Sequence, residues 1–404
     1  MRIVYLHQYF NTPNMAGGTR SYEMARRLVA LGHEVDLVTS ARDRDVGDWR
    51  VTDEAGIRVH WLPVAYDNSM GFTARLRAFV RFAVAAARRA TALRADVVFA
   101  TSTPLTIVLP GLYASRVQRI PLVFEVRDLW PEVPIALGVL RNPILIALAR
   151  WLERLAYRSA RHVVALAPGM RDDIVATGIP TEKVTVIPNG CDRAIFGVNQ
   201  EEPAKALRAR HPWLQQRRML LFGGTLGRAN GVGYLVAVAA AMQKIDPEIR
   251  FVVIGDGAES KMIADAARDA GVLDQSFLML GSMPKVELAT WLAASDMALG
   301  LFSGPRVLWK DAVQNKFFDA LAAGKPVACN FRGFQSEIAE QHDVGLIFDA
   351  EDPTHAARQI HEKLTDDAWL RSVRDRALSL AASEFDRDRL ATRLSDVLQR
   401  VVTR

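Results

Sequence analysis

Short β-branched runs alternate with helical stretches along nearly the whole chain, which limits the possible folds more than any other feature. The first unit is a strand at 3–6, a polar glycine-bearing loop at 11–19, a helix at about 20–30 and a strand at 34–39. Further strands are expected at 97–100, 122–125, 162–167 and 184–187. A strand, helix, strand order makes the two strands parallel, because a helical crossover returns the chain to the same end of the sheet. The sequence therefore predicts an α/β protein with parallel sheets.

The same rhythm begins again after a polar segment at 197–217, which we expect to be a linker with a short helix inside. Strands are expected at 219–222, 251–254, 277–280, 296–301 and 326–330, with helices at 231–243, 259–270 and 285–294 between them. A chain of 404 residues is long enough for two ordinary domains with separate cores. We therefore predict two Rossmann-like, doubly wound domains facing a cleft, at 1–198 and 199–384.

Composition excludes several classes of protein. Half of the residues are apolar and 24% are charged, as in soluble globular proteins and unlike disordered chains. Cys191 and Cys329 have no nearby His or Cys with which to share a metal, so a reduced cytoplasmic setting is expected. The first residues are too polar for a signal peptide. The most apolar later run, 135–149, is broken by Arg141 and Pro143, so no membrane-spanning segment is expected.

Three glycine-bearing loops follow predicted strands. Gly17 and Gly18 precede a helix, where glycine lets backbone N–H groups approach a phosphate, although such pairs are common in loops. The glycine-dense loop at 223–231, which leaves a strand and enters a helix, is a stronger signal. Gly255-Asp256-Gly257 also follows a strand, but Ser260 stands where the dinucleotide fingerprint has its third glycine. A nicotinamide-dependent enzyme is therefore not expected.

A helix beginning at about Gln314 carries groups that attract an anion. Asn315, Lys316 and Asp319 share the arc opposite its apolar face, so Asp319 is expected to be exposed. Free N–H groups in the first turn, an amide and a lysine together suit an anion. A surface helix with a Lys316–Asp319 ion pair is the alternative, and this stretch alone leaves both interpretations open.

Five stretches together resemble the retaining nucleotide-sugar glycosyltransferases of family 4, which have the two-domain GT-B fold. They lie at 17–39, 186–196, 222–231, 251–257 and 317–327, in an order and spacing that cover nearly the whole chain. R-D-L-W-P-E at 127–132, with N-K-F-F-D-A-L-A-A-G from Asn315, resembles the bacterial O-antigen and capsule branch, which includes N-acetyl-L-fucosamine transferases. The resemblance implies retention of anomeric configuration, no cofactor, no metal, and a C-terminal helix at 385–404 that returns to the first domain.

The resemblance also implies roles for individual residues. Donor-binding roles fall on Gly17, Gly18, Thr19, Thr225, Arg228, Asn230, Gly257, Asn315, Lys316 and Asp319. The family usually has two glutamates separated by seven residues, and Asp311 and Asp319 keep that spacing with shorter side chains. Asp319 resembles the ligand of the ribose diol, because carboxylate oxygens accept hydrogen bonds from paired hydroxyls. Asp311 is expected beside the donor sugar and is predicted to be catalytic.

The family's usual cationic clamp for the pyrophosphate is absent from the glycine loop. Thr225 and Asn230 stand where the family usually has Arg and Lys, and neither carries a charge. A diphosphate leaving group gains negative charge as the glycosidic bond breaks, and a cation normally stabilises it. We predict that Lys316 is the main diphosphate ligand and Arg228 its helper, with Asn315 and backbone amides completing the site.

Asp128 is the candidate for orienting or deprotonating the acceptor hydroxyl, because it follows a predicted strand at the cleft. An Arg127–Asp128 pair or a helix cap is the alternative interpretation. His7 ends the first strand at the same edge, and a histidine at the border of the core is the preferred interpretation of it.

Basic residues outnumber acidic ones by 51 to 45, and the excess lies in the first half. Arg77, Arg81 and Arg88 share a helical face, with Phe79 and Phe82 among the residues opposite, and Arg150, Arg154 and Arg158 recur every four residues. A solvated face on an inward-packing helix is the simpler interpretation. We favour peripheral attachment to the anionic inner face of the plasma membrane, to which each basic residue contributes about 1 kcal/mol. Nucleic acid is not expected, because no aromatic stacking platform or recognition helix accompanies the charge.

The resemblance, together with these features, implies a cytoplasmic glycosyltransferase of cell-surface polysaccharide biosynthesis. Its donor would be a UDP-N-acetyl-aminosugar, such as UDP-L-FucNAc or UDP-GlcNAc. Its acceptor would be a saccharide linked to polyprenyl diphosphate. The alternative is a nucleotide-sugar 2-epimerase, which can share the two-domain fold but acts on a soluble sugar. A pure binding module is a third interpretation, disfavoured by two nucleotide-type sheets.

Overall fold

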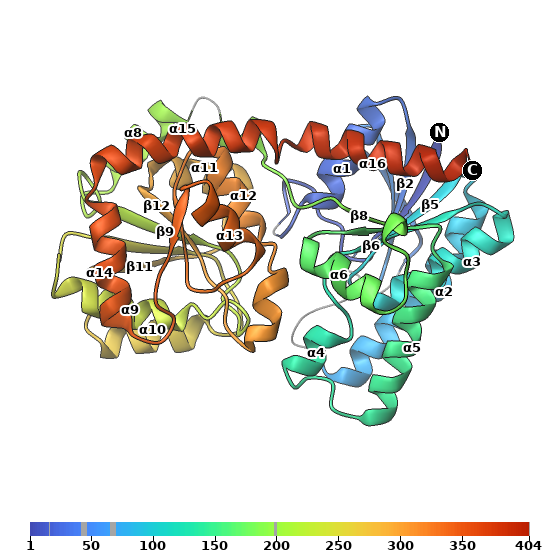
Figure 1. The fold of residues 1–404 in the computed structure, drawn as a ribbon, viewed down its shortest axis with the longest axis horizontal. Helices are drawn as coiled ribbons and strands as arrows, with labels where there is room; N and C mark the ends of the chain where they lie inside the picture. Colours follow the sequence, from blue (N-terminus) through green and yellow to red (C-terminus); the bar gives the residue numbers. More distant parts are fainter. Residues whose placement is uncertain (16, 42–46, 65–69, 198–199, 404) are drawn as a thin grey trace. The chain divides into compact units, whose positions relative to one another are not determined.

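The computed structural model describes residues 1–15, 17–41, 47–64, 70–197 and 200–403 (Figure 1). The chain divides into two compact units, each with its own sheet. Unit 1 comprises Met1–Thr12, Gly17–Pro188 and Asp388–Arg404, and unit 2 comprises Pro13–Ala16 and Asn189–Arg387. Both are α/β units with predominantly parallel sheets, as the alternation of strands and helices predicts.

The described part of unit 1 contains an eight-stranded sheet in the order β3-β4-β2-β1-β5-β6-β7-β8. Its strands are β1 Arg2–Leu6, β2 Glu34–Ser40, β3 Arg50–Glu54, β4 Ile57–Leu62, β5 Val97–Thr101, β6 Leu122–Val126, β7 His162–Ala165 and β8 Val184–Val186. Every pair is parallel except β3 with β4. That hairpin turns through Ala55 and Gly56, both with positive φ, as a two-residue turn requires.

Helices cover both faces of this sheet. Residues of α1 and α16 share one core with Tyr5 and Phe99, while α3 packs on the other face. There Gly111 lies so close to Ala100 and Leu122 that a Cβ would touch their side chains at 3.2–3.3 Å. The helices are α1 Arg20–Ala30, α2 Phe72–Ala92, η1 Leu105–Ile107, α3 Val108–Gln118, α4 Glu132–Ala136, α5 Pro143–Ser159, α6 Pro168–Ala176, η2 Thr181–Lys183 and α16 Arg387–Val402.

The described part of unit 2 contains a six-stranded parallel sheet in the order β11-β10-β9-β12-β13-β14. Its strands are β9 Met219–Gly223, β10 Arg250–Ile254, β11 Phe277–Leu280, β12 Met297–Gly300, β13 Val327–Cys329 and β14 Gly345–Ile347. Its helices are α7 Arg193–Phe196, α8 Glu201–Arg210, α9 Gly233–Gln243, α10 Ser260–Asp269, α11 Lys285–Ala294, η3 Arg306–Asp311, α12 Asn315–Ala322, α13 Phe334–Gln341, α14 Pro353–Leu364 and α15 Asp367–Ser383.

The segment expected to be a linker belongs instead to unit 2. Its α8 packs against α11, and the Arg208 guanidinium donates to the Ala294 carbonyl at 2.6 Å and to Asp296 at 2.9 Å. Its polar composition reflects a solvated outer helix face rather than an unpacked segment. The division between the units lies at Pro188 and Asn189, whereas the expected position at 198 and 199 falls outside the described residues.

Candidate active site

Two glycine loops of unit 2 lie against each other at the carboxyl ends of β9 and β10. A Cβ on Gly255 would lie 1.8 Å from the Gly224 carbonyl oxygen, and one on Gly257 would lie 2.4 Å from that of Leu226. Gly224 N–H donates to the Ile254 carbonyl, and Leu226 N–H to the Asp256 carbonyl. Only glycine permits this approach, so Gly257, expected to contact the donor, has a clear role in loop packing.

Lys316, in the first turn of α12, lies directly against the glycine loop after β9. Its Nζ is 3.8 Å from the centroid of the Phe222 ring and 3.4 Å from Asn230 Oδ1. Asn230 Nδ2 in turn donates to the Thr225 carbonyl at 2.9 Å. The structure therefore brings Thr225, Asn230 and Lys316 together, and the two neutral residues of the loop lie beside a cation supplied by α12.

Lys316 lies in an environment that disfavours its charged form. Burial lowers its pKa to about 7, and its near neighbours are an aromatic ring and an amide rather than a carboxylate. Asn315 Oδ1 beside it is buried without a hydrogen-bond partner among the described residues. An anion placed here would meet the N–H groups at the start of the helix and would favour the charged form of the lysine.

Arg228 is the second cation of this region. It lies exposed in the glycine loop, and no ion pair engages it within the described ranges. Its guanidinium therefore retains its full hydrogen-bonding capacity for a ligand.

Asp319 lies in a different environment from the expected exposed one. It is 8% exposed, and its Oδ1 lies 3.4 Å from Lys285 Nζ at the start of α11. Lys285 also lies 3.3 Å from Asp192 Oδ2, which Arg387 approaches at 3.8 Å. We call Asp192, Lys285, Asp319 and Arg387 the ionic cluster. Within the described residues Lys316 and Asp319 therefore contact other residues and form no ion pair with each other. The expectation of an exposed Asp319 was wrong, because α11 covers this side chain.

The charge balance in the ionic cluster disfavours ionisation of Asp319. Burial raises the pKa of its carboxyl above the ordinary value, while Lys285 and Arg387 act in the opposite direction. Asp192 Oδ1 is buried without a hydrogen-bond donor among the described residues. Asp319 Oδ1 faces the Lys285 ammonium, so the carboxyl of Asp319 is held next to the first turn of α12 by a charge from α11.

Asp311 ends η3 and is also buried, 3.9 Å from the ammonium of its neighbour Lys310. In unit 1, Gly17 has φ +122°, and a Cβ there would lie 2.7 Å from Asn11 Nδ2. Asn11 Nδ2 donates to the Gly18 carbonyl at 3.3 Å, and Thr19 is the buried N-cap residue of α1. The glycine pair therefore forms a tight turn that leads into α1.

Asp128 follows β6 and is exposed, whereas its neighbour Arg127 turns toward His7. Arg127 Nη1 lies 3.3 Å from His7 Nε2, and Arg127 N–H donates to Ser102 Oγ at 3.0 Å. Within the described ranges no ion pair joins Arg127 to Asp128. His7 is buried, as a histidine at the border of the core would be. Asp128 therefore keeps a carboxylate available at the carboxyl edge of the sheet.

Sequence reasoning missed a buried ion pair beneath this edge. Arg20 and Glu125 are 2% and 0% exposed, and Arg20 Nη2 lies 2.8 Å from Glu125 Oε1. Thr101 Oγ1 donates to Glu125 Oε2, and Arg20 also donates to the carbonyls of Ile187 and Pro188. Glu125 is a charged residue within an otherwise apolar predicted strand, and this feature could have indicated a buried ion pair. The pair fixes α1 to the last strands of unit 1.

Two family models match the chain, one for each half. A glycosyl transferase 4-like domain matches residues 16–190, and a glycosyl transferases group 1 domain matches residues 204–378. The chain is a glycosyltransferase of the 4-like and group 1 type. The residues predicted to bind the donor, with Asp128 and Asp311, lie within these two matches, whereas His7 and, in the ionic cluster, Asp192 and Arg387 lie outside them.

Relatives of this glycosyltransferase act in several pathways. It is 27% identical to the D-inositol 3-phosphate glycosyltransferase of Thermobispora bispora, over 96% of this chain and 91% of that protein. It is 23% identical to the putative colanic acid biosynthesis glycosyl transferase WcaI of Escherichia coli, over 67% of this chain and 70% of that protein. The structure of Anabaena HepE in complex with UDP superposes with a TM-score of 0.72 at 18% identity, covering 99% and 100% of the two chains. That likeness establishes the GT-B fold.

Two further observations concern the described part of this glycosyltransferase. It contains no group of three or more His, Cys, Asp or Glu side chains arranged to hold a metal ion. Its described helices also include none that is long and apolar enough to cross a bilayer.

Proposed function

We propose that this glycosyltransferase transfers a sugar from a uridine diphosphate donor to a lipid-linked saccharide, with retention of configuration. The observation that carries the proposal is the position of Lys316, at the start of α12 and against the glycine loop. Helix N–H groups and a lysine, packed against a glycine loop that carries an exposed arginine, provide a site for a diphosphate.

In the proposed reaction the acceptor oxygen attacks the anomeric carbon from the face that the diphosphate leaves. The bond between the anomeric carbon and the diphosphate oxygen breaks, and a bond to the acceptor oxygen forms. Lys316 and Arg228 stabilise the negative charge that develops on the diphosphate. A metal ion has this role in other phosphate-binding sites. Asp128 orients the acceptor hydroxyl or takes its proton. Asp311 lies beside the donor sugar, and the carboxyl of Asp319 accepts hydrogen bonds from the ribose diol.

The nature of both substrates is part of the proposal. UDP is favoured because HepE, which shares the fold, was crystallised with it. The similarity to WcaI, which is named for colanic acid biosynthesis, favours a role in polysaccharide synthesis. The lipid-linked acceptor and a donor such as UDP-GlcNAc or UDP-L-FucNAc come from the resemblance of 127–132 to the O-antigen and capsule branch. An enzyme with such an acceptor works at a membrane, and we propose the inner face of the plasma membrane.

Two helices of unit 1 support a membrane-facing surface. On α2 the exposed Arg77, Arg81 and Arg88 accompany the exposed apolar side chains of Leu76, Val80 and Val84, while Phe82 is buried. On α5 the exposed Arg150, Arg154 and Arg158 accompany Ile144, Leu148 and Trp151. Arginines interleaved with apolar side chains suit the boundary between anionic headgroups and acyl chains.

A panel of nucleotides should identify the donor. We expect UDP and one UDP-sugar to raise the thermal midpoint, since saturation at a hundred times Kd adds about 2.7 kcal/mol of stability. EDTA should leave the shift unchanged. The best ligand is then incubated with lipid-linked acceptors, and the product's anomeric configuration is read by NMR. If no nucleoside diphosphate shifts the midpoint, the proposal fails. Isomerisation of the donor sugar without an acceptor would favour the epimerase.

Asp128→Asn should lower turnover by about 10²–10⁴-fold with little change in donor affinity, because general base catalysis contributes on that order. Glu132→Gln in α4 is the matched control, because it removes an exposed carboxylate that pairs with Arg150 at 3.1 Å. Turnover is measured by transfer of radiolabelled sugar, and donor affinity by calorimetry. A decrease of equal size in the two variants would assign Asp128 a purely structural role.

A further inference from the structure

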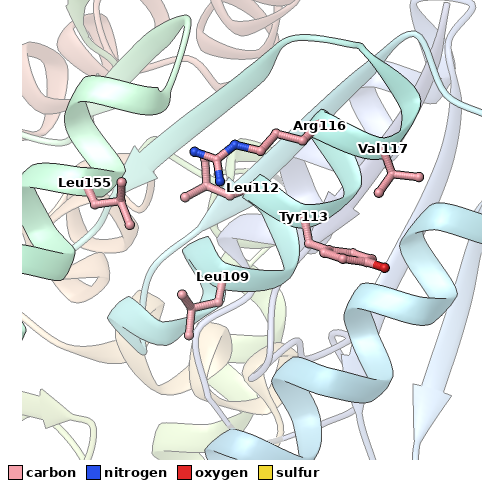
Figure 2. Close-up of a pocket in the computed structure, with 6 residues that line it drawn as sticks. All are labelled: Leu109, Leu112, Tyr113, Arg116, Val117 and Leu155. Atoms are coloured by element: carbon pink, nitrogen blue, oxygen red, sulfur yellow. The ribbon is translucent and has the colours of Figure 1, made fainter.

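An open apolar groove lies between α3 and α5 of unit 1. Its volume is about 450 Å³, within the range of small-molecule sites. It is lined by Leu109, Leu112, Tyr113, Arg116, Val117 and Leu155 (Figure 2). In the close-up the Arg116 side chain extends over Leu112 toward Leu155 of α5. The groove is thus apolar along its length, with one guanidinium across it.

The α3 side of the groove is unusually exposed for apolar residues. Leu109, Tyr113 and Val117 recur every four residues and are 43%, 55% and 56% exposed. They form a continuous stripe along the helix, because residues four apart share a face. The helices α2 and α5 also carry exposed apolar side chains, and exposed apolar patches are typical of membrane or partner contacts.

The charge around the groove selects for an anion. Neither α2 nor α3 contains an acidic residue, and the single acid of α5, Glu153, is buried and accepts a hydrogen bond from Tyr157. Arg116 has no ion pair within the described ranges. A ligand that satisfies both features has an apolar chain and an anionic headgroup.

We propose that the groove binds one acyl chain of an anionic membrane phospholipid, with the lipid phosphate at Arg116. The proposal extends the membrane attachment proposed above, by adding a lipid site to a surface contact, and it is independent of the sugar transfer. A single guanidinium matches the one phosphate of a phospholipid better than the diphosphate of a polyprenyl carrier, which would call for more cations.

Photocrosslinking tests this site directly. The full chain is bound to vesicles of phosphatidylcholine and phosphatidylglycerol, the latter with a diazirine in its acyl chain, and crosslinked peptides are mapped by mass spectrometry. We expect crosslinks to concentrate on 109–117 and Leu155. Arg116→Gln should lower their yield about fivefold, as expected for one basic residue at an anionic surface. Arg119→Gln, an exposed arginine at the C-cap of the same helix and outside the groove lining, is the control and should change little.

A second variant separates groove binding from surface attraction. Replacing Arg77, Arg81 and Arg88 together with Gln should weaken co-sedimentation and its salt dependence. The protein that remains bound should still crosslink in the groove. Crosslinks spread evenly over α2, α3 and α5 would overturn the proposal in favour of surface contact alone. Groove crosslinks displaced by polyprenyl diphosphate but not by unlabelled phosphatidylglycerol would assign the groove to the acceptor.

Neither readout requires a donor or a transfer reaction. A failed transfer assay with groove crosslinks intact would refute the proposed reaction and keep the lipid site. Absence of groove crosslinks in a protein that transfers sugar would refute the lipid site and keep the proposed reaction. Because the substituted side chains are exposed, the variants should keep the wild-type melting curve.

Discussion

Replacing Lys316 with methionine should remove most of the protein's preference for a nucleoside diphosphate over the nucleoside, and at neutral pH it should stabilise the fold. Hydrogen bonds to a charged group contribute about 1.5–3 kcal/mol, so diphosphate affinity should fall about tenfold to a hundredfold. Turnover should fall further, by about 10²–10³-fold, because charge on the diphosphate increases as the glycosidic bond breaks.

The gain in stability follows from the lowered pKa of Lys316. Its pKa in the fold is about 7, against 10.5 for an ordinary lysine. Between these values the unfolded chain holds a proton that the folded protein lacks, so wild-type stability rises with pH through this window. The methionine variant lacks this dependence. Its advantage should be largest below pH 7, on the order of 1–2 kcal/mol for a partly solvated group, and should vanish above pH 10.5.

Because the pKa of Lys316 is near 7, binding of a diphosphate should change the protonation state of this lysine. At pH 8 Lys316 of the unliganded protein is mostly neutral, and a bound diphosphate favours its charged form, so Lys316 should take up a proton when UDP binds. Titration calorimetry in two buffers with different ionisation enthalpies measures that uptake. Arg228→Gln is the control, with a smaller loss of affinity, no change in stability and the same proton uptake. If Lys316→Met retains the full preference for diphosphate, the cation that meets the leaving group lies elsewhere.

Lys285→Met should be the most destabilising of the substitutions considered, at about 3 kcal/mol. It leaves Asp192 and Asp319 buried without the ammonium that lies between them, and removing one member of a buried ionic cluster carries a cost of this order. The deficit should shrink as pH falls toward 4. An acid whose folded pKa is raised is stabilised by protonation in the fold, so stability is lost as pH rises through that pKa.

Asp319→Asn should instead abolish measurable UDP binding with little loss of stability, because the burial that raises the pKa of Asp319 already disfavours its charge. The double variant Lys285→Met/Asp319→Asn separates the two effects. It should regain part of the stability lost in Lys285→Met, since one uncompensated carboxylate is gone, but it should not regain nucleotide affinity. Urea unfolding and calorimetric titration provide the two measurements. Wild-type affinity in Asp319→Asn would exclude a contact with the ribose.

The sequence predicted the strands that are short, apolar and buried. Val97–Thr101 and Met297–Gly300 are examples, because a strand covered on both faces has a continuous apolar run. It did not predict the β3–β4 hairpin, since β3 lies at an exposed edge and carries charges that are typical of a loop. β14 has only three residues and offers no periodicity.

The candidate site was partly predictable for a similar reason. Lys316 lies beside the glycine loop because both follow neighbouring strands of a parallel sheet, and strand order can be inferred from motifs. The partner of Asp319 could not be inferred, because Lys285 comes from a different helix and nothing in its local sequence marks it as buried. Asp192 lies within a recognised motif, yet its contact with Lys285 depends on how α11 packs.

The position of α16 has a consequence for how the protein is made. Its side chains Leu390, Leu394, Val397 and Leu398 belong to the core of unit 1, although the rest of that unit ends at Pro188. A ribosome must therefore translate about two hundred residues of unit 2 before the helix that completes unit 1 emerges. During that interval the face of the first sheet that α1 and α16 share has only α1 as its cover. Unit 2 is contiguous apart from Pro13–Ala16, so we expect the second unit translated to complete its core before the first.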